Sequence, residues 1–553
     1  MSTVVNFNGK NIVEPGVYAQ TKANVNINPV PFSTGNVLII DDGSGVDFGG
    51  GSGINGDLAS GLNSVYNFTS LIDFRNFVRG GKLWDLAEYL FIPENGVAGA
   101  PQVSLIRAAT TTPSTITYDF TAGANGGTLV IDMKNEGLEG KTADDDESIS
   151  SSVAADTKVR TGWGSLMKSG VIDNTKYFIE FYEGTFKGLD ADGDPYDGLD
   201  ILSCEPIIIA KSPEFNNLND LITWINTDTS FNARFKKNAS TTVVGTGALV
   251  AGDYTANNTL KLATGGTTVY GSTDFDEVLA KIGEVDYTFV LSLNSGILAK
   301  GANNTKLLYH ITQQAEFKKF MFVGGGDDEN AWTGTNGSID IAQYFNSAYA
   351  ITCHSGHRED VNFTAEEKLK SSLYHAACVC GRLAGLAPQT SGTFKSLRIK
   401  KWRHVLTPEQ RVTALQAGVL HNRYVQNIGY VINQAINTIQ KNTQMINPDA
   451  TSNEISIMRI AEQLNKELVL NMRPIFVGQN LNTASPADVK AFIEGYLTQR
   501  TATKINDNYI IRFSNVSVVQ VQDYYNCTYN FVANSPLNKI FITGFMLDAN
   551  LSA

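Results

Sequence analysis

Charge, cysteine and long apolar runs are all scarce in this sequence of 553 residues. Charged side chains make up 18% of the chain, compared with about 25% in a typical soluble domain. No window of about 18 apolar residues and no basic-then-apolar start occurs, so we expect neither a membrane span nor a secretory signal. The 42% of hydrophobic residues is enough for a packed core, which excludes an intrinsically disordered chain.

Positive charge is scarce as well. The chain has 43 Lys and Arg against 55 Asp and Glu, a net charge of −12, and no run of basic residues. Because nucleic-acid binding depends on cations that neutralise phosphates, we expect neither DNA nor RNA as a partner. The 5 cysteines are odd in number and lack the spacing of a disulfide framework, so we expect reduced thiols.

The length of the chain predicts two or three domains, because a single hydrophobic core stops growing near about 250–300 residues. Few charges and 50 glycines leave a surface of neutral polar and apolar groups. Such a surface suits a subunit that buries much of its exterior in an assembly.

The order of segments predicts a multi-domain α/β (α+β) protein. Prolines and alternating apolar residues make 1–35 an extended arm, followed by a buried strand at 36–40 and two helices within 68–91. Residues 111–284 are rich in Thr, Gly and Asp and include an acidic run at 144–147. We interpret this stretch as an inserted, outward-facing, mostly β domain, because α/β alternation resumes after residue 285.

Helix signals are clearest in the second half of the chain. Thr364 with Glu367, and Thr407 with Gln410, have the spacing of a capping box, so each pair predicts a helix start. Further helices are predicted at 454–471 and 485–499, and β structure from residue 509 onward.

Two loops resemble ligand sites but depart from the required patterns. Gly43, Gly45 and Gly49 follow a strand, yet their spacing is wrong for a dinucleotide loop, so a surface loop is favoured. The loop 190–200 begins like a calcium site, but Pro195 stands where an EF-hand needs glycine. A looser cation site there stays open beside an ordinary Asp/Gly turn. Its carboxylates would be those of Asp192, Asp194, Asp197 and Asp200.

The densest group of histidine and cysteine could in principle bind zinc. It comprises Cys353, His354, His357, His375, Cys378 and Cys380. Cys378 and Cys380 lie two apart in a helical stretch and point to different faces, whereas a zinc knuckle needs its cysteines in a turn. We therefore favour small buried thiols in helix packing. No nucleophile motif is present, so we expect neither an enzyme nor a cofactor.

The arrangement as a whole resembles the contractile tail sheath proteins of bacteriophages and related injection machines. The arm with Pro15-Gly16-Val17-Tyr18, the helical segment 74–91 and the strand ending at Arg107 are similar to the family's start. Residues 373–387 resemble its small-residue helix, and 406–418 its next helix. Later segments of the chain also fit the family's order, namely 459–479, 486–497 and 539–547, and the sequence 135–140 resembles a glycine motif of the inserted domain.

The resemblance implies a division of the chain. Residues 1–20 would form the N-terminal arm, and 21–110 with 285–535 a discontinuous sheath core. Residues 111–284 would form the inserted domain, and 536–553 the C-terminal arm. The strand around Ile540, Phe541 and Ile542 would be an aggregation hazard as a free edge, so we expect it to pair with the arm of a neighbour. The residues of that arm are Val4, Val5 and Phe7.

The resemblance also implies function and partners. A sheath subunit polymerises as stacked helical rings around a tail tube and contracts from a metastable state, driving the tube through the host envelope. Candidate contacts to the tube are Lys490, Arg500 and Lys504. The partners would be copies of the chain itself, the tube, baseplate and tail terminator proteins, with assembly in the host cytoplasm and a place in the virion tail. The alternative is another self-assembling structural protein, such as a tail tube, baseplate or surface-layer component.

Overall fold

The structure is a computed structural model that describes most of the chain. It covers residues 5–7, 10–12, 34–41, 65–78, 81–107, 110–119, 127–136, 159–172, 176–187, 207–215, 218–227, 239–243, 259–262, 267–269, 274–292, 300–315, 317–360, 367–439, 453–479, 484–503 and 508–534. None of the helices in these ranges combines the length and apolarity needed to cross a bilayer.

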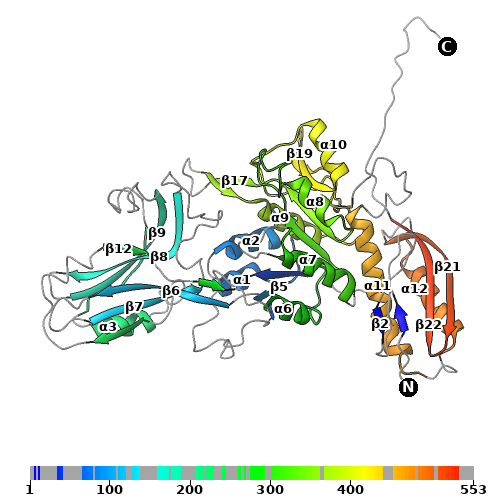
Figure 1. Ribbon diagram of the computed structural model, residues 1–553, viewed down its shortest axis with the longest axis horizontal. Helices are drawn as coiled ribbons and strands as arrows, with labels where there is room; N and C mark the ends of the chain where they lie inside the picture. Colours follow the sequence, from blue (N-terminus) through cyan, green and yellow to red (C-terminus); the bar gives the residue numbers. More distant parts are fainter. Residues whose placement is uncertain are drawn as a thin grey trace, which may run out of the picture.

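An eight-stranded sheet forms the centre of the molecule (Figure 1). Its order is β20-β19-β16-β15-β14-β3-β5-β4, with parallel pairing from β19 to β5 and an antiparallel strand at each edge. The strands are β3 Val37–Asp41, β4 Val65–Phe68, β5 Val103–Arg107, β14 Phe289–Ser292, β15 Phe320–Gly324, β16 Ala350–His354, β19 Val419–Val425 and β20 Gly429–Ile432. A mixed α/β fold, as the sequence predicts, is confirmed.

Helices cover both faces of this sheet, because its central strands are apolar on both sides. Val37 and Ile39 pack with helices on one face, whereas Leu38 and Ile40 pack with helices on the other. The first face carries α1 Leu71–Val78, α2 Gly81–Phe91 and α9 Ser372–Ala384. The second carries α6 Asp274–Ile282, α7 Ala302–Tyr309 with a final turn at His310–Gln314, and α8 Ser338–Phe345. Helix α10 Pro408–Ala417 packs beside β19 and α8.

Small residues let α9 lie unusually close to α2. A Cβ added at Gly381 would stand 2.5 Å from the backbone oxygens of Tyr89 and Leu90. Cys378 and Cys380, on the same helix, are fully buried, and the Cys378 thiol donates to the carbonyl of Pro93 at 3.3 Å. The prediction that these cysteines are small packing residues of a helix is therefore confirmed.

The stretch between β5 and α6 forms two four-stranded sheets that share no strand with the central sheet. Their strands are β6 Thr110–Asp119, β7 Gly127–Glu136, β8 Val159–Ile172, β9 Lys176–Lys187, β10 Ile207–Lys211, β11 Ala239–Val243, β12 Thr259–Leu262 and β13 Thr267–Val269. Helix α3 Leu218–Thr227 contacts strands of both sheets. In Figure 1 this unit lies to one side of the central sheet.

Helix α6 falls within the predicted insertion, 111–284, but packs on the central sheet. Phe275, Val278 and Ile282 are buried together with Leu38 and Val290. The apolar face of α6 therefore contributes to the core that β3 and β14 share.

The C-terminal part of the chain is a separate layer of two helices and a two-stranded ribbon. It comprises α11 Ile455–Phe476, α12 Pro486–Gln499, β21 Ile510–Val521 and β22 Tyr524–Ala533, which enclose a core of their own. At the other end of the chain, β1 Val5–Phe7 pairs with β2 Lys10–Ile12 as a short antiparallel hairpin.

Two predicted helix starts are confirmed and one is wrong. Thr407 and Gln410 form a reciprocal capping box at the start of α10, and Ser485 with Asp488 does the same for α12. Glu367, in contrast, opens strand β18 Glu367–Lys370, which pairs with β17 His357–Asp360, and the helix begins only at Ser372. Pairing with β17 satisfies the backbone groups of residues 367–370, so this segment is a strand and not the first turn of a helix.

Candidate assembly surfaces

The β21–β22 ribbon is the surface best suited to bind another strand. It pairs antiparallel from Ile510–Ala533 at one end to Val521–Tyr524 at the other. In the described part of the chain, no further strand joins it, apart from a single bridge between Thr501 and Ile510. As far as the described residues go, both outer edges therefore present backbone N–H and C=O groups, which is a template for strand addition.

One side of the ribbon is covered and the other carries apolar side chains in the open. Val516 and Tyr529 pack against α11 and α12, and the Tyr529 hydroxyl donates to Asn465 Oδ1 at 3.0 Å. The exposed apolar residues are Ile511, Val519, Val521 and Val532. A strand added at this ribbon would therefore gain apolar contacts as well as hydrogen bonds.

Lys490 lies on the outer side of α12, where the sequence analysis places a tube contact. Its side chain is 48% exposed and pairs with Glu494 at 3.7 Å, one helical turn further on. An exposed pair of this kind contributes only about 0.3–0.5 kcal/mol, so the lysine can exchange its partner at little cost. Lys504 lies outside the described residues.

Arg500 is engaged inside the subunit. Its guanidinium lies 4.0 Å from Glu467 Oε2 and 5.9 Å from the centre of the Tyr509 ring. Burial raises the pKa of Glu467 to about 8, and this outweighs the opposing effects of Gln463 and Arg500. The carboxyl group is therefore protonated at neutral pH, and Arg500 packs beside it without forming a full ion pair.

The predicted linking residues are only partly described. Val5 and Phe7 lie in β1, while Val4, Ile540, Phe541 and Ile542 fall outside the described residues. The glycine loop with Gly43, Gly45 and Gly49 and the loop 190–200 with Asp192, Asp194, Asp197 and Asp200 also fall outside them.

Histidines gather at one corner of the central sheet. His354 ends β16, and His421 faces it in the parallel register of β19, while His375 extends from α9 and His404 from the loop before α10. Trp332 and Trp402 pack on their rings. His357 joins this histidine cluster through its ring contact with Trp402, and its Nε2 lies 2.8 Å from the Tyr89 hydroxyl. His354, His357 and His375 belong to the histidine and cysteine group that is dense in the sequence. His404 and His421, which lie outside that group, are brought in by loop placement and by sheet pairing.

Hydrogen bonds hold the cluster in neutral tautomers. His354 Nδ1 donates to the carbonyl of Gly326 at 3.0 Å, so its Nε2 accepts from His404 Nδ1, also at 3.0 Å. His421 Nδ1 donates to the Val419 carbonyl, so its Nε2 accepts from the Asn433 amide. His354 and His421 thus each accept a hydrogen bond at Nε2, and protonation of that nitrogen would break the bond.

Burial lowers the pKa of each of these histidines. It lowers the pKa of His357 and of His375 to about 3 and that of His421 to about 4. The pKa values of His354 and His404 are also lowered, chiefly by burial. Within the described ranges, no three His, Cys, Asp or Glu side chains are grouped to hold a metal ion. The cluster is a packed polar core at one corner of the sheet.

One curated relative aligns with nearly the whole chain. The tail sheath protein of Bacillus phage SP01 is 24% identical over 590 aligned positions, which cover 97% of this chain and 96% of that protein. No family model matches the sequence.

Solved sheath structures align along most of the chain at low identity. The sheath tail protein of Desulfitobacterium hafniense is 13% identical with a TM-score of 0.49, covering 94% of this chain and 99% of that one. The sheath tail protein of Listeria innocua is 12% identical with a TM-score of 0.44, covering 92% and 96%. TM-scores below 0.5 do not establish a shared fold, so the sequence relative carries the comparison. This chain is therefore similar over nearly its whole length to a tail sheath protein, which confirms the family resemblance predicted from the order of its segments.

Proposed function

We propose that this chain is the structural subunit of a contractile tail sheath. It would polymerise as stacked helical rings around a tail tube and contract from a metastable extended state. The observation that carries this proposal is the similarity to a tail sheath protein along 97% of the chain. The low charge of the surface and the open β21–β22 ribbon support a protein that binds copies of itself.

The links between subunits would be strands donated by the terminal arms. The ribbon edge would accept the N-terminal arm with Val4, Val5 and Phe7 from one neighbour. It would also pair with the C-terminal strand around Ile540 and Ile542. Backbone hydrogen bonds do not depend on side-chain identity, and the arms can reorient while the bonds persist. The lattice would stay connected while the subunit bodies rotate.

The energy of contraction would reside in the lattice itself. An assembly with many interfaces can occupy a metastable arrangement and release free energy when the interfaces repack into a better-matched one. The tube and baseplate would act as templates for the extended state. A structural role of this kind assigns no catalytic residue and no cofactor.

Negative-stain electron microscopy of the purified chain tests the proposal, with hollow tubes as the expected result. Removing residues 1–9, or replacing Ile540 and Ile542 with proline, should leave a folded subunit that does not polymerise, because proline removes the ladder donors. The matched control replaces the same two residues with threonine, which keeps the N–H groups and the strand propensity.

Tubes from the threonine variant and dispersed subunits from the proline variant would support strand exchange as the link. Ordered tubes from the proline variant or from the chain lacking residues 1–9 would show that the arms are not the links. Small discrete particles from the unmodified chain under all conditions would contradict the sheath function itself.

A further inference from the structure

The region that contains α10 and the β19–β20 hairpin differs in charge from the rest of the chain. Residues 368–448 include eleven Lys and Arg but a single carboxylate, Glu409, although the net charge of the whole chain is −12. The remainder of the chain is therefore strongly acidic. Such a separation of charge favours contact between the basic region of one copy and an acidic region of another.

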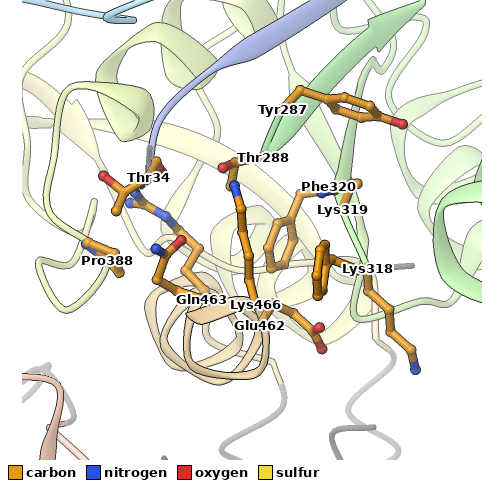
Figure 2. Close-up of a pocket in the computed structure, with 12 residues that line it drawn as sticks. Thr34, Tyr287, Thr288, Lys318, Lys319, Phe320, Pro388, Glu462, Gln463 and Lys466 are labelled. Carbon is orange, nitrogen blue, oxygen red and sulfur yellow. Dashed lines mark hydrogen bonds between the residues drawn. The ribbon is translucent and has the colours of Figure 1, made fainter. Parts of the chain in front are cut away.

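Four cations of this region are paired with carboxylates of the same subunit. The pairs are Lys370 with Asp85, Arg398 with Glu88, Lys400 with Glu94 and Arg403 with Asp328. Lys466 of α11 is paired in the same way elsewhere in the chain. Figure 2 shows it at a small cavity against the central sheet, and its partner is Asp286. Cations of this kind need no partner from outside the subunit.

Arg411 and Arg423 are not balanced in this way. Arg411 lies near the start of α10, and Arg423 lies on the same side of β19 as Val419, which packs against Ala414 of α10. Both arginines are half-buried. Among the described residues, neither guanidinium forms an ion pair with a carboxylate, and Arg423 Nε is buried without a hydrogen-bond partner.

The two arginines also act on each other. Burial and then the positive charge of Arg411 lower the pKa of Arg423, and both arginines lower the pKa of the buried His421. Two neighbouring guanidinium groups that repel each other are suited to bind a carboxylate, which accepts hydrogen bonds and supplies the opposite charge.

Phe394 provides an apolar platform for this arginine pair. The guanidinium carbon of Arg423 lies 4.3 Å from the centre of the Phe394 ring, and Phe394 is 44% exposed. The φ angle of Phe394 is 62°, which aromatic residues rarely adopt, and its N–H donates to the Ile432 carbonyl at 2.9 Å. Because stacking orders the guanidinium, Arg423 loses less conformational entropy when it binds a partner.

We propose that Arg411 and Arg423, together with Phe394, bind the acidic run 144–147 of a second copy of the chain. This run, Asp-Asp-Asp-Glu, is the longest series of consecutive carboxylates in the sequence. It lies outside the described residues, between β7 and β8, and Figure 1 shows these strands well apart from α10. We therefore assign the run to a neighbour. The inference rests on the proposed self-assembly and adds a side-chain contact to strand exchange.

Exchange of the charges tests this contact in the full-length chain. Arg411→Glu with Arg423→Glu should raise the subunit concentration needed for tubes by about tenfold or more at low salt, because a charge-assisted contact becomes repulsive. Asp145→Lys with Asp146→Lys should have the same effect. The chain with all four substitutions should assemble again, because the charges are once more opposite. Negative-stain electron microscopy over a dilution series measures the outcome.

The matched control is Lys306→Glu, which reverses an exposed lysine of α7 that is paired with Asp276. It should form tubes at the same concentration as the unmodified chain. Arg411→Glu alone protects the test against a variant that fails to fold. It places a carboxylate beside Arg423 and near the start of a helix, so the Tm of the dispersed subunit should stay equal or rise while assembly is impaired.

Three results would overturn the inference and leave the sheath function intact. These are normal tubes from the doubly reversed arginine variant, no recovery when all four charges are exchanged, and a lower Tm of the dispersed Arg411→Glu subunit. The last result would mean that Arg411 serves a contact within its own subunit. Absence of tubes from the unmodified chain would instead contradict the sheath function, and the inference with it.

Discussion

At the scale of single residues, the histidine cluster makes stability sensitive to acid. Five of the 6 histidines of the chain are held neutral by burial and by hydrogen bonds at one corner of the central sheet. The positive charges of Lys370 and Arg398 lower the pKa of His357 in addition to burial. Arg411 and Arg423 lower the pKa of His421 in the same way. Positive side chains from several elements therefore oppose protonation of the histidines at this corner.

We predict that the free energy of unfolding decreases as the pH falls below about 6.5. In the unfolded chain these histidines bind protons near pH 6.5, whereas the folded pKa values of His357 and His421 are about 3 and 4. At these histidines the unfolded state therefore binds more protons over this window, and stability rises with pH by up to about 1.4 kcal/mol per pH unit for each histidine. Glu467, whose folded pKa is raised to about 8, opposes this slope by one proton, so the histidines together outweigh it below about pH 6.5. Urea unfolding between about pH 7.5 and pH 5 measures the slope.

The variant His357→Gln tests the assignment. Glutamine keeps a polar partner for the Tyr89 hydroxyl, which lies 2.8 Å from His357 Nε2, but it does not titrate. Its unfolding free energy should depend less steeply on pH than that of the unmodified chain. An unchanged slope would remove His357 from the acid-sensitive group.

A second residue-scale prediction concerns the close approach of α9 and α2. Gly381→Ala would place a methyl group 2.5 Å from two backbone oxygens of α2, so one helix must move. Overpacking of this kind costs about 1–3 kcal/mol, measured as a shift in the denaturant midpoint. The control Gly495→Ala, on α12, meets nothing within 4 Å and should not destabilise the chain. Equal stability of the two variants would contradict the close packing.

At the scale of elements, α12 and the ribbon have different roles in the proposed assembly. Within the described ranges the ribbon has no further strand at its edges, whereas α12 offers one exposed lysine on a surface of small and polar residues. Arg500, one of the candidate tube contacts, already packs beside Glu467 and Tyr509. The structure therefore favours Lys490 over Arg500 for a contact that must form and break.

We predict that Lys490→Glu with Lys504→Glu impairs assembly on an acidic tube at low salt without unfolding the subunit. The loss should be smaller at high salt, because screening weakens the original attraction. Co-sedimentation with tubes measures assembly, and circular dichroism measures folding. Lys281→Glu on α6, where the lysine is 43% exposed and paired with Glu284, is the matched control. Normal assembly of the double variant would remove α12 from the tube interface.

At the scale of the whole molecule, the central sheet is completed by strands from both sides of the unit that contains β6 to β13. β3 precedes that unit and β14 follows it, yet the two strands are parallel neighbours. We propose that the unit is a separable domain, and that its second boundary lies before α6 and not at residue 284. The burial of Phe275, Val278 and Ile282 in the core of the sheet supports this placement.

Two deletions with the same short linker distinguish these boundaries. Removing 112–272 should leave a soluble core with cooperative unfolding, because α6 remains on the sheet. Removing 112–282 should expose Leu38, Ile40 and Val290 and cause aggregation, measured by size-exclusion chromatography and thermal melting. Aggregation of both products would contradict a separable domain, and equal solubility of both would contradict the role of α6.

The sequence by itself was sufficient where neighbouring residues decide the structure. The reciprocal caps of Thr407 with Gln410 and of Ser485 with Asp488 act within one helical turn. The four consecutive apolar residues at 37–40 are all fully buried in the sheet. The tertiary structure decided the rest. Glu367 entered a hairpin, α6 joined the central sheet, and His354 became the neighbour of His421 in that sheet. Such meetings depend on the order of strands in the sheet, which no local pattern of residues encodes.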